Sequence, residues 1–156
     1  MGSQETKPGK LITFEGGEGT GKSTQVRRLS SALREAGRTV VETREPGGTA
    51  GAEEIRKILL NGPPEKWLPS TETLLMYAAR ADHVERIIKP SLRRGDIVIS
   101  DRFSDSSMAY QGLAGGFGEN ALGILDGLIL GNFRPDLTLI LDLPIEHGLK
   151  RAATRG

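Results

Sequence analysis

The stretch KLITFEGGEGTGKST at residues 10–24 decides the fold. Its apolar run predicts a strand over residues 10–14, and the pattern after the glycines predicts a helix over residues 22–36. Between them lies the spacing G-x-x-x-x-G-K-[ST], which in this context is typical of a P-loop. Glycines let the backbone turn its N–H groups inward, and the helix adds the positive end of its dipole, so such a loop binds phosphate oxygens. The sequence therefore predicts binding of a nucleoside triphosphate.

The residue types within this loop predict individual contacts. Lys22 would reach the β- and γ-phosphates, and the hydroxyl of Ser23 would bind Mg²⁺. The expected ATP-binding residues are Gly16, Gly17, Glu18, Gly19, Thr20, Gly21, Lys22, Ser23 and Thr24.

The composition describes one ordinary globular domain, with 156 residues, 37% hydrophobic and 26% charged. A net charge of +1 gives no field that would attract nucleic acid or a membrane, and the absence of cysteine excludes disulfides and thiolate metal sites. No apolar run reaches the ~20 residues of a membrane span. Residues 1–9 are polar, lack the apolar core of a signal peptide and are expected to form a disordered tail. We therefore expect a cytoplasmic protein without nucleic-acid or membrane partners.

Strand and helix patterns alternate along the rest of the chain. The expected strands cover residues 10–14, 38–43, 96–100 and 137–143, and the expected helices residues 22–36, 52–60, 70–92 and 120–130, with a last helix after Pro144. In the helix over residues 70–92 we expect an inward apolar stripe that includes Leu74 and Ala78, and a bend at Pro90. Ile58 is expected to face inward, and residues 112–118 to form a flexible loop. This order predicts a three-layer α/β P-loop fold with a parallel sheet flanked by helices.

Charged residues follow the second and third strands, at the sheet edge where ligands bind in open α/β folds. Arg44 and Glu45 begin the turn REPGGT and could face a ligand. An aspartate that ends a strand near a P-loop is a typical Mg²⁺ ligand, which Asp101 matches, and Arg102 beside it suits bidentate phosphate contact. Arg80 lies mid-helix, where a solvated surface arginine is an equally good interpretation.

Two features favour a kinase over a motor protein or a DNA-dependent ATPase. No strand ends in the pair Asp-Glu, whose glutamate would polarise an attacking water. Arginines also fall at the predicted ligand edge, where a second phosphate would need neutralising. Trp67, the single tryptophan, is more typical of packing than of chemistry.

Taken together, these motifs resemble the thymidylate kinase family of the bacterial type. The resemblance rests on five segments in family order: the loop at residues 16–23, REPGGT at 44–49, LLMYAAR at 74–80, DRFSDSSMAYQ at 101–111 and RPDLTLILDLP at 134–144. It covers nearly the whole chain from Lys10, and REPGGT with DRF and the downstream AYQ is a specific combination.

The resemblance implies a nucleoside monophosphate kinase that transfers the γ-phosphoryl group of ATP to dTMP, gives dTDP and requires Mg²⁺. It implies catalytic roles for Lys22, Arg102 and Arg155, and metal binding by Ser23 and Asp101. The dTMP-binding residues that it implies are Glu18, Arg44, Pro46, Met76, Arg80, Arg102, Ser106, Ser107, Tyr110 and Gln111. Because the family is usually dimeric, a homodimer is expected, with the helices over residues 70–92 and 120–130 as candidate interface.

This chain departs from the family pattern at two places. Met76 stands where many members have a phenylalanine, and a thioether lacks a ring that could stack on a base. The sequence stops at Gly156, where the family's lid would begin, and Arg155 matches the lid's leading arginine. We therefore expect a kinase core over residues 10–156 without most of the lid and C-terminal part, and we expect the sequence to omit residues. Another (deoxy)nucleotide kinase, or an ATP-binding module with little turnover, remains an alternative.

Overall fold

The computed structural model describes residues 8–63 and 65–153. Residues 1–7 of the expected tail and Arg155 lie outside the described residues. The strands are β1 (Lys10–Glu15), β2 (Val40–Arg44), β3 (Ile97–Asp101) and β4 (Leu137–Ile140). The helices are α1 (Lys22–Glu35), α2 (Ala50–Leu60), α3 (Pro69–His83), α4 (Lys89–Arg93), α5 (Ser104–Ser107), α6 (Glu119–Ile129) and α7 (Ile145–Ala153), with π-helical segments η1 (Val84–Ile88) and η2 (Met108–Ala114).

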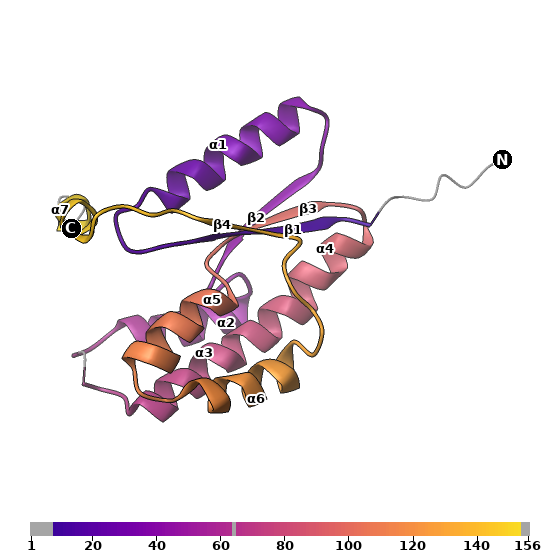
Figure 1. Ribbon diagram of the computed structural model, residues 1–156. Coiled ribbons are helices and arrows are strands. Elements are labelled where there is room, and N and C mark those ends of the chain that lie inside the picture. The colour runs from indigo at the N-terminus through magenta and orange to yellow at the C-terminus, as the bar shows by residue number, and fades with distance from the viewer. Residues whose placement is uncertain (1–7, 64, 154–156) are drawn as a thin grey trace.

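The sheet has the order β2-β3-β1-β4, and every pair of neighbouring strands is parallel. Helix α1 covers one face and α2 to α6 cover the other, while α7 lies beyond the end of β4 (Figure 1). These layers confirm the predicted three-layer α/β P-loop fold. All strands run in one direction, so the loops that follow them gather at one edge of the sheet.

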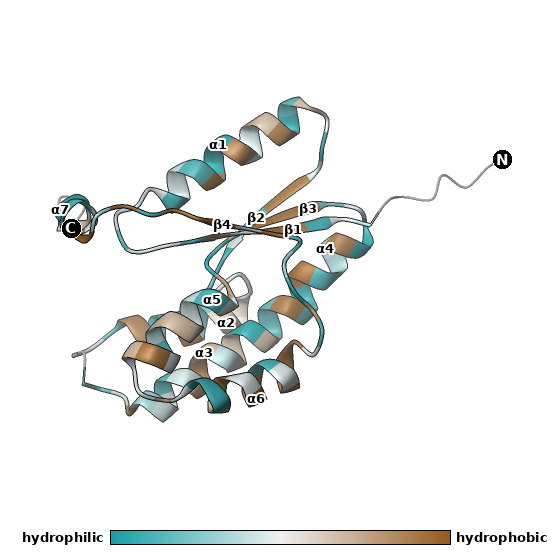
Figure 2. Ribbon diagram, in the orientation of Figure 1, coloured by the Kyte–Doolittle hydropathy of each residue, from teal (hydrophilic) through white to brown (hydrophobic). Residues whose placement is uncertain are grey.

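Two hydrophobic clusters hold the layers together, one on each face. Phe14, Val26, Val40, Ile97 and Ile99 pack between the sheet and α1. On the other face, the cluster consists of Leu11, Val84, Ile88, Val98, Phe103 and Leu130. Hydrophobic residues run along the strands, whereas α1 alternates hydrophobic and hydrophilic positions (Figure 2). The central strands β1 and β3 are therefore largely buried on both faces, as expected for parallel strands between two helical layers, whereas the edge strands β2 and β4 are partly exposed.

The predicted helix over residues 70–92 is interrupted, and the side of it that faces the protein interior differs from the predicted side. A π-helical segment separates α3 from α4 just before Pro90, because the proline cannot donate a backbone hydrogen bond. The inward stripe is wrong at its start, since Leu74 and Ala78 are exposed. The buried face of α3 instead carries Arg80 and His83. Both side chains form hydrogen bonds with the buried carboxylate of Glu45.

Smaller corrections concern ends and loops. Ile58, expected to face inward, is 43% exposed. The segment expected to be a loop from Gly112 belongs to η2 as far as Ala114. The last strand ends at Ile140 rather than at residue 143. Within the described residues, no helix is both long and apolar enough to cross a bilayer.

Candidate active site

The P-loop follows β1 and folds around the side chain of Lys22. Gly16 has φ 132°, and a Cβ there would collide with the carbonyl oxygen of Leu141, so only glycine fits. The Lys22 ammonium donates to the carbonyl oxygens of Gly16 at 2.9 Å and Gly17 at 2.7 Å. Burial, together with the nearby Arg102, lowers the pKa of Lys22. A cation is thus held at the start of a helix, where phosphate oxygens are bound.

Ser23, in the first turn of α1, contacts Asp101, the last residue of β3. The Ser23 hydroxyl donates to Asp101 Oδ2 at 2.9 Å. A hydroxyl and a carboxylate are hard oxygen donors of the kind that Mg²⁺ takes, usually together with substrate phosphates and water. Among the described residues, no group of three or more His, Cys, Asp or Glu side chains could form a metal cage by itself. The pair therefore fits a Mg²⁺ ion that arrives with a nucleotide.

Arg102 is held in an unusual backbone conformation directly after β3. Its φ is 72°, and it is the one non-glycine residue with positive φ in the described part of the chain. Its N–H donates to Phe14 O at 2.9 Å and its carbonyl accepts from the Ser100 hydroxyl at 2.8 Å. The guanidinium donates to Ser106 Oγ at 3.0 Å and lies 5.1 Å from the ring centre of Tyr110. Strain of this kind is retained where it aims a functional side chain.

Glu15, the last residue of β1, connects the P-loop to this arginine. Its carboxylate accepts from the backbone N–H of Phe103 at 2.8 Å and from the Ser106 hydroxyl. Ser106 in turn accepts from Arg102, so one hydroxyl links the two side chains. Burial raises the pKa of Glu15 above its usual value, although these hydrogen bonds and Arg102 oppose the shift. This contact could not be predicted from the sequence, because Glu15 has the pattern of a polar residue at the end of a strand.

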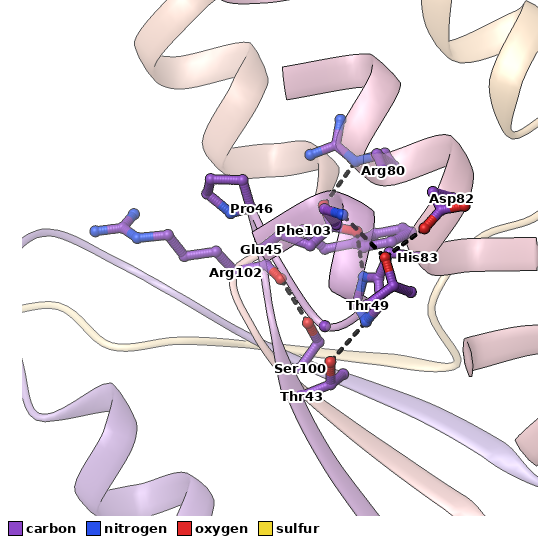
Figure 3. A network of polar contacts seen from close by, with 12 residues as sticks. Thr43, Glu45, Pro46, Thr49, Arg80, Asp82, His83, Ser100, Arg102 and Phe103 are labelled. Carbon is purple, nitrogen blue, oxygen red and sulfur yellow. Dashed lines mark hydrogen bonds and ion pairs between the residues drawn. The ribbon is translucent and has the colours of Figure 1, made fainter. Parts of the chain in front are cut away.

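A buried chain of polar contacts lies behind the second strand (Figure 3). Glu45 accepts from Arg80 Nε at 2.7 Å and pairs with His83 Nδ1 at 2.9 Å, and His83 Nε2 lies 2.6 Å from Thr43 Oγ1. Arg80 Nη2 donates to Ser107 Oγ at 2.9 Å. Burial alone would raise the pKa of Glu45, but Arg80 and His83 outweigh it and hold that pKa below its usual value. The Glu45 carboxylate thus faces Arg80 and His83 in the interior, which corrects the expectation that Glu45 could face a ligand.

Two adjoining cavities meet at Arg102. The first, about 480 Å³, lies over the P-loop and is lined by Lys22, Ser23, Arg44, Arg56 and Asp101 among others. The second, about 650 Å³, is lined by Pro46, Trp67, Met76, Ser106, Tyr110 and Gln111 among others. Glu18, Pro46, Leu60 and Arg102 border both cavities. This arrangement suits two ligands whose phosphates meet between a donor side and an acceptor side.

Most of the residues implied by the resemblance therefore lie together. Ser107 does not line either cavity, because it is fully buried and its hydroxyl accepts from Arg80. Arg80, which is 1% exposed, and Thr24, in the first turn of α1, also line neither of the two cavities. Arg56, which lines the first cavity and donates to Pro46 O at 2.8 Å, was not predicted as a site residue. Trp67 was interpreted as a packing residue, and it lines the second cavity.

Comparisons with known proteins agree on one family. The family model described as "Thymidylate kinase" matches residues 14–156. The chain is 57% identical over 148 residues to the thymidylate kinase of Caulobacter vibrioides, covering 95% of this chain and 71% of that protein. It is 51% identical over 150 residues to that of Dinoroseobacter shibae, covering 96% and 72%. A crystal structure of thymidylate kinase from Ehrlichia chaffeensis matches with a TM-score of 0.81 and 40% identity over 93% of this chain and 78% of the other. The chain belongs to the thymidylate kinase family.

Proposed function

We propose that ATP binds over the P-loop and dTMP in the 650 Å³ cavity, and that the γ-phosphoryl group passes between them to give dTDP. In-line phosphoryl transfer requires a cradle for the donor, neutralised phosphates and an oriented acceptor rather than a covalent nucleophile. The two cavities that meet at Arg102 supply this arrangement. Mg²⁺, held by Ser23 and Asp101, would supply charge neutralisation for the phosphates.

The proposal that the acceptor base is thymine rests on two buried polar atoms that have no hydrogen-bond partner within the described chain. Among the described residues, Arg80 Nη1 is a donor without an acceptor, and Gln111 Oε1 is an acceptor without a donor. Gln111 Nε2 donates to Glu72 Oε1 at 2.9 Å, which fixes the orientation of the amide. Thymine offers a carbonyl O4 next to an N3–H, so it can satisfy both atoms at once. Cytosine offers an amine and a lone pair at these positions and would leave both unsatisfied.

The position of Arg80 along α3 supports this pairing. Glu72, Met76 and Arg80 follow one another at intervals of four residues, so they lie along one face of the helix. Glu72 and Met76 line the 650 Å³ cavity, and Arg80 follows on the same helix face one turn further along, buried beneath the cavity wall. We propose that its guanidinium reaches the base edge from there. Met76 lies where the base would rest, so its thioether would contact the ring without stacking.

The remaining contacts follow from the residues at the cavity walls. Arg102 would hold the acceptor phosphate, while Lys22 and the loop amides hold the donor phosphates. Glu18 would lie near the sugar 3′-hydroxyl, and Tyr110 where a ribose 2′-hydroxyl would go. Arg44 borders the phosphate cavity, and its charge would help to neutralise the meeting phosphates. Arg155 is proposed as the lid arginine that completes this charge, and turnover by an Arg155→Ala variant tests it.

Initial rates of ADP release with dTMP, dUMP, dCMP, UMP and thymidine test the assignment, with Lys22→Ala as the inactive control. We expect dTMP to be preferred and dCMP to be rejected by about 10²-fold or more in kcat/KM, because two buried groups would stay unpaired. Phosphorylation of thymidine but not dTMP would overturn the proposal. Binding of ATP in calorimetry without any dTDP would favour the ATP-binding module instead.

We further propose that the protein forms a homodimer and is located in the cytoplasm. Exposed apolar side chains on and beside α3 and α6 support the dimer, because a face of this kind is normally covered. These side chains are Leu74, Leu113, Ile124 and Leu128. Sedimentation equilibrium would show a mass of twice the monomer, and a charged substitution at Leu128 should shift it toward the monomer.

A further inference from the structure

His83 is completely buried and held from three sides, although it touches neither cavity. Its Nδ1 lies 2.9 Å from Glu45 Oε1 and its Nε2 lies 2.6 Å from Thr43 Oγ1. Gly48, at φ 93°, stands against the ring so closely that a Cβ there would collide with His83 Cδ2. Figure 3 shows the ring between Thr43 and Glu45. The ring therefore has little freedom to move.

The two carboxylate oxygens of Glu45 are divided between two partners. Oε1 accepts from His83 and Oε2 accepts from Arg80. The torsion that turns a carboxylate is soft, so a carboxylate with one partner can rotate. Without His83, Glu45 could turn both oxygens to Arg80 and accept from Nε and Nη2 together, which is a favourable bidentate pairing. That pairing would withdraw Nη2 from Ser107.

The orientation of the Glu45 carboxylate determines the orientation of the whole Arg80 guanidinium, because the guanidinium donors are fixed in one rigid plane. Nε is fixed by Glu45 and Nη2 by Ser107, so the direction of Nη1 is fixed too. The rings of Tyr77 and Phe103 hold the plane, with centres 4.9 and 5.3 Å from the guanidinium carbon. Nη1 is the buried donor without a partner, and a small rotation of the fork would change where it points.

We propose that His83 is a positioning residue for recognition of the acceptor base. By holding one oxygen of Glu45, it keeps Arg80 in the orientation in which Nη1 meets the base carbonyl. This inference rests on the proposed function, in which Arg80 reads O4 of dTMP. It assigns base selectivity to a side chain that never touches the nucleotide. His83 acts only through Glu45, and no proton transfer is involved.

Two substitutions separate the two ends of the imidazole ring. In His83→Asn the side-chain amide takes the place of Nδ1 and can still donate to Glu45. In His83→Gln the amide takes the place of Nε2, so Thr43 keeps a partner while Glu45 loses one. A Thr43→Val variant is the matched control, since it removes the other hydrogen bond of the ring and leaves the bond to Glu45.

Steady-state kinetics with dTMP and dCMP, and urea unfolding of every variant, decide the proposal. We expect His83→Gln to raise KM for dTMP about tenfold, the effect of one lost hydrogen bond, with KM for ATP unchanged. The preference for dTMP over dCMP should fall by a similar factor. His83→Asn should stay within about twofold of wild type in both quantities. Thr43→Val should lower stability and leave the preference intact.

Other outcomes overturn the inference. A folded His83→Gln protein with the wild-type preference for dTMP would do so, and so would equal losses of preference in His83→Asn and Thr43→Val. If His83→Gln does not fold, Glu45→Gln replaces it, because its amide has one oxygen for two donors, and an unchanged preference then overturns the inference. Wild-type protein that does not phosphorylate dTMP at all would instead refute the proposed function.

Discussion

Removing the Glu45 carboxylate should destabilise the protein more than any exposed substitution. Glu45 is 4% exposed and its partner Arg80 is 1% exposed. In Glu45→Ala the guanidinium stays buried without an anion, and His83 loses its acceptor as well. Loss of one partner from a buried ion pair costs about 3–5 kcal/mol. That is a large share of the roughly 5–15 kcal/mol by which a domain is stable.

A double-variant cycle separates the unpaired charge from the lost side chain. Urea unfolding at pH 7 would compare wild type, Glu45→Ala, Arg80→Met and the double variant. Because the double variant leaves no unpaired charge of this ion pair buried, it should be more stable than Glu45→Ala alone, with a coupling of about 2 kcal/mol or more. Additive losses within about 0.5 kcal/mol would refute the reasoning.

The pH dependence provides an independent check, and its sign follows from the pKa. Burial would raise the pKa of Glu45, but Arg80 and His83 outweigh it, so the folded-state pKa lies below the usual value of 4.5. A carboxyl group with a depressed pKa stabilises the fold above its unfolded-state pKa, and this contribution is lost as the pH falls. The stability gap between wild type and Glu45→Gln should therefore narrow below about pH 4.5. A constant gap down to pH 3 would contradict this account.

Three further substitutions test the donor side and its link to the acceptor. Lys22→Ala should lower kcat by about 10²–10³, as expected for loss of a charge that stabilises the transition state. Calorimetric affinity for dTMP should not change, and a change would argue against a donor-side role. Gly16→Ala should destabilise by about 1–3 kcal/mol and abolish ATP binding, because it forces a side chain into Leu141 O at positive φ. Near-normal ATP affinity would refute this. Glu15→Gln removes a carboxylate whose pKa burial raises, so the charge opposes folding increasingly as pH rises through that pKa. The Glu15→Gln variant should be at least as stable as wild type at pH 7. Its turnover should fall, because the Ser106 hydroxyl loses its acceptor. A large loss of stability would contradict this prediction.

The fold could be predicted because local patterns and global topology agree. The P-loop identified β1 and α1 within one residue of their observed limits. Alternation of strands with helices requires parallel strands, and parallel strands place all following loops at one edge. Arg44, Asp101 and Arg102 were therefore expected near the P-loop, and they border the cavity over it.

The orientation of α3 could not be predicted, because periodicity counts apolar residues and treats charged ones as solvated. Arg80 and His83 are buried on α3 only because Glu45, 35 and 38 positions away along the chain, lies opposite them. Their burial turns Leu74 outward. The local sequence of α3 contains no signal for a partner that lies so far away along the chain. Glu15 was missed for the same reason, since its partner Ser106 is 91 positions away.

Under the proposed function, strand pairing helps to bring the donor and acceptor phosphates together. The P-loop begins after β1 and Arg102 follows β3, and these strands are neighbours with Phe14 opposite Asp101. Adjacent strands lie about 4.8 Å apart, so the P-loop and Arg102 start one strand spacing from each other. Positive φ at Arg102 then turns its side chain toward Ser106, which Glu15 also holds. A one-residue slip between β1 and β3 would send Arg102 to the opposite face, so under the proposed function the register of these two strands would set where Arg102 meets the acceptor phosphate.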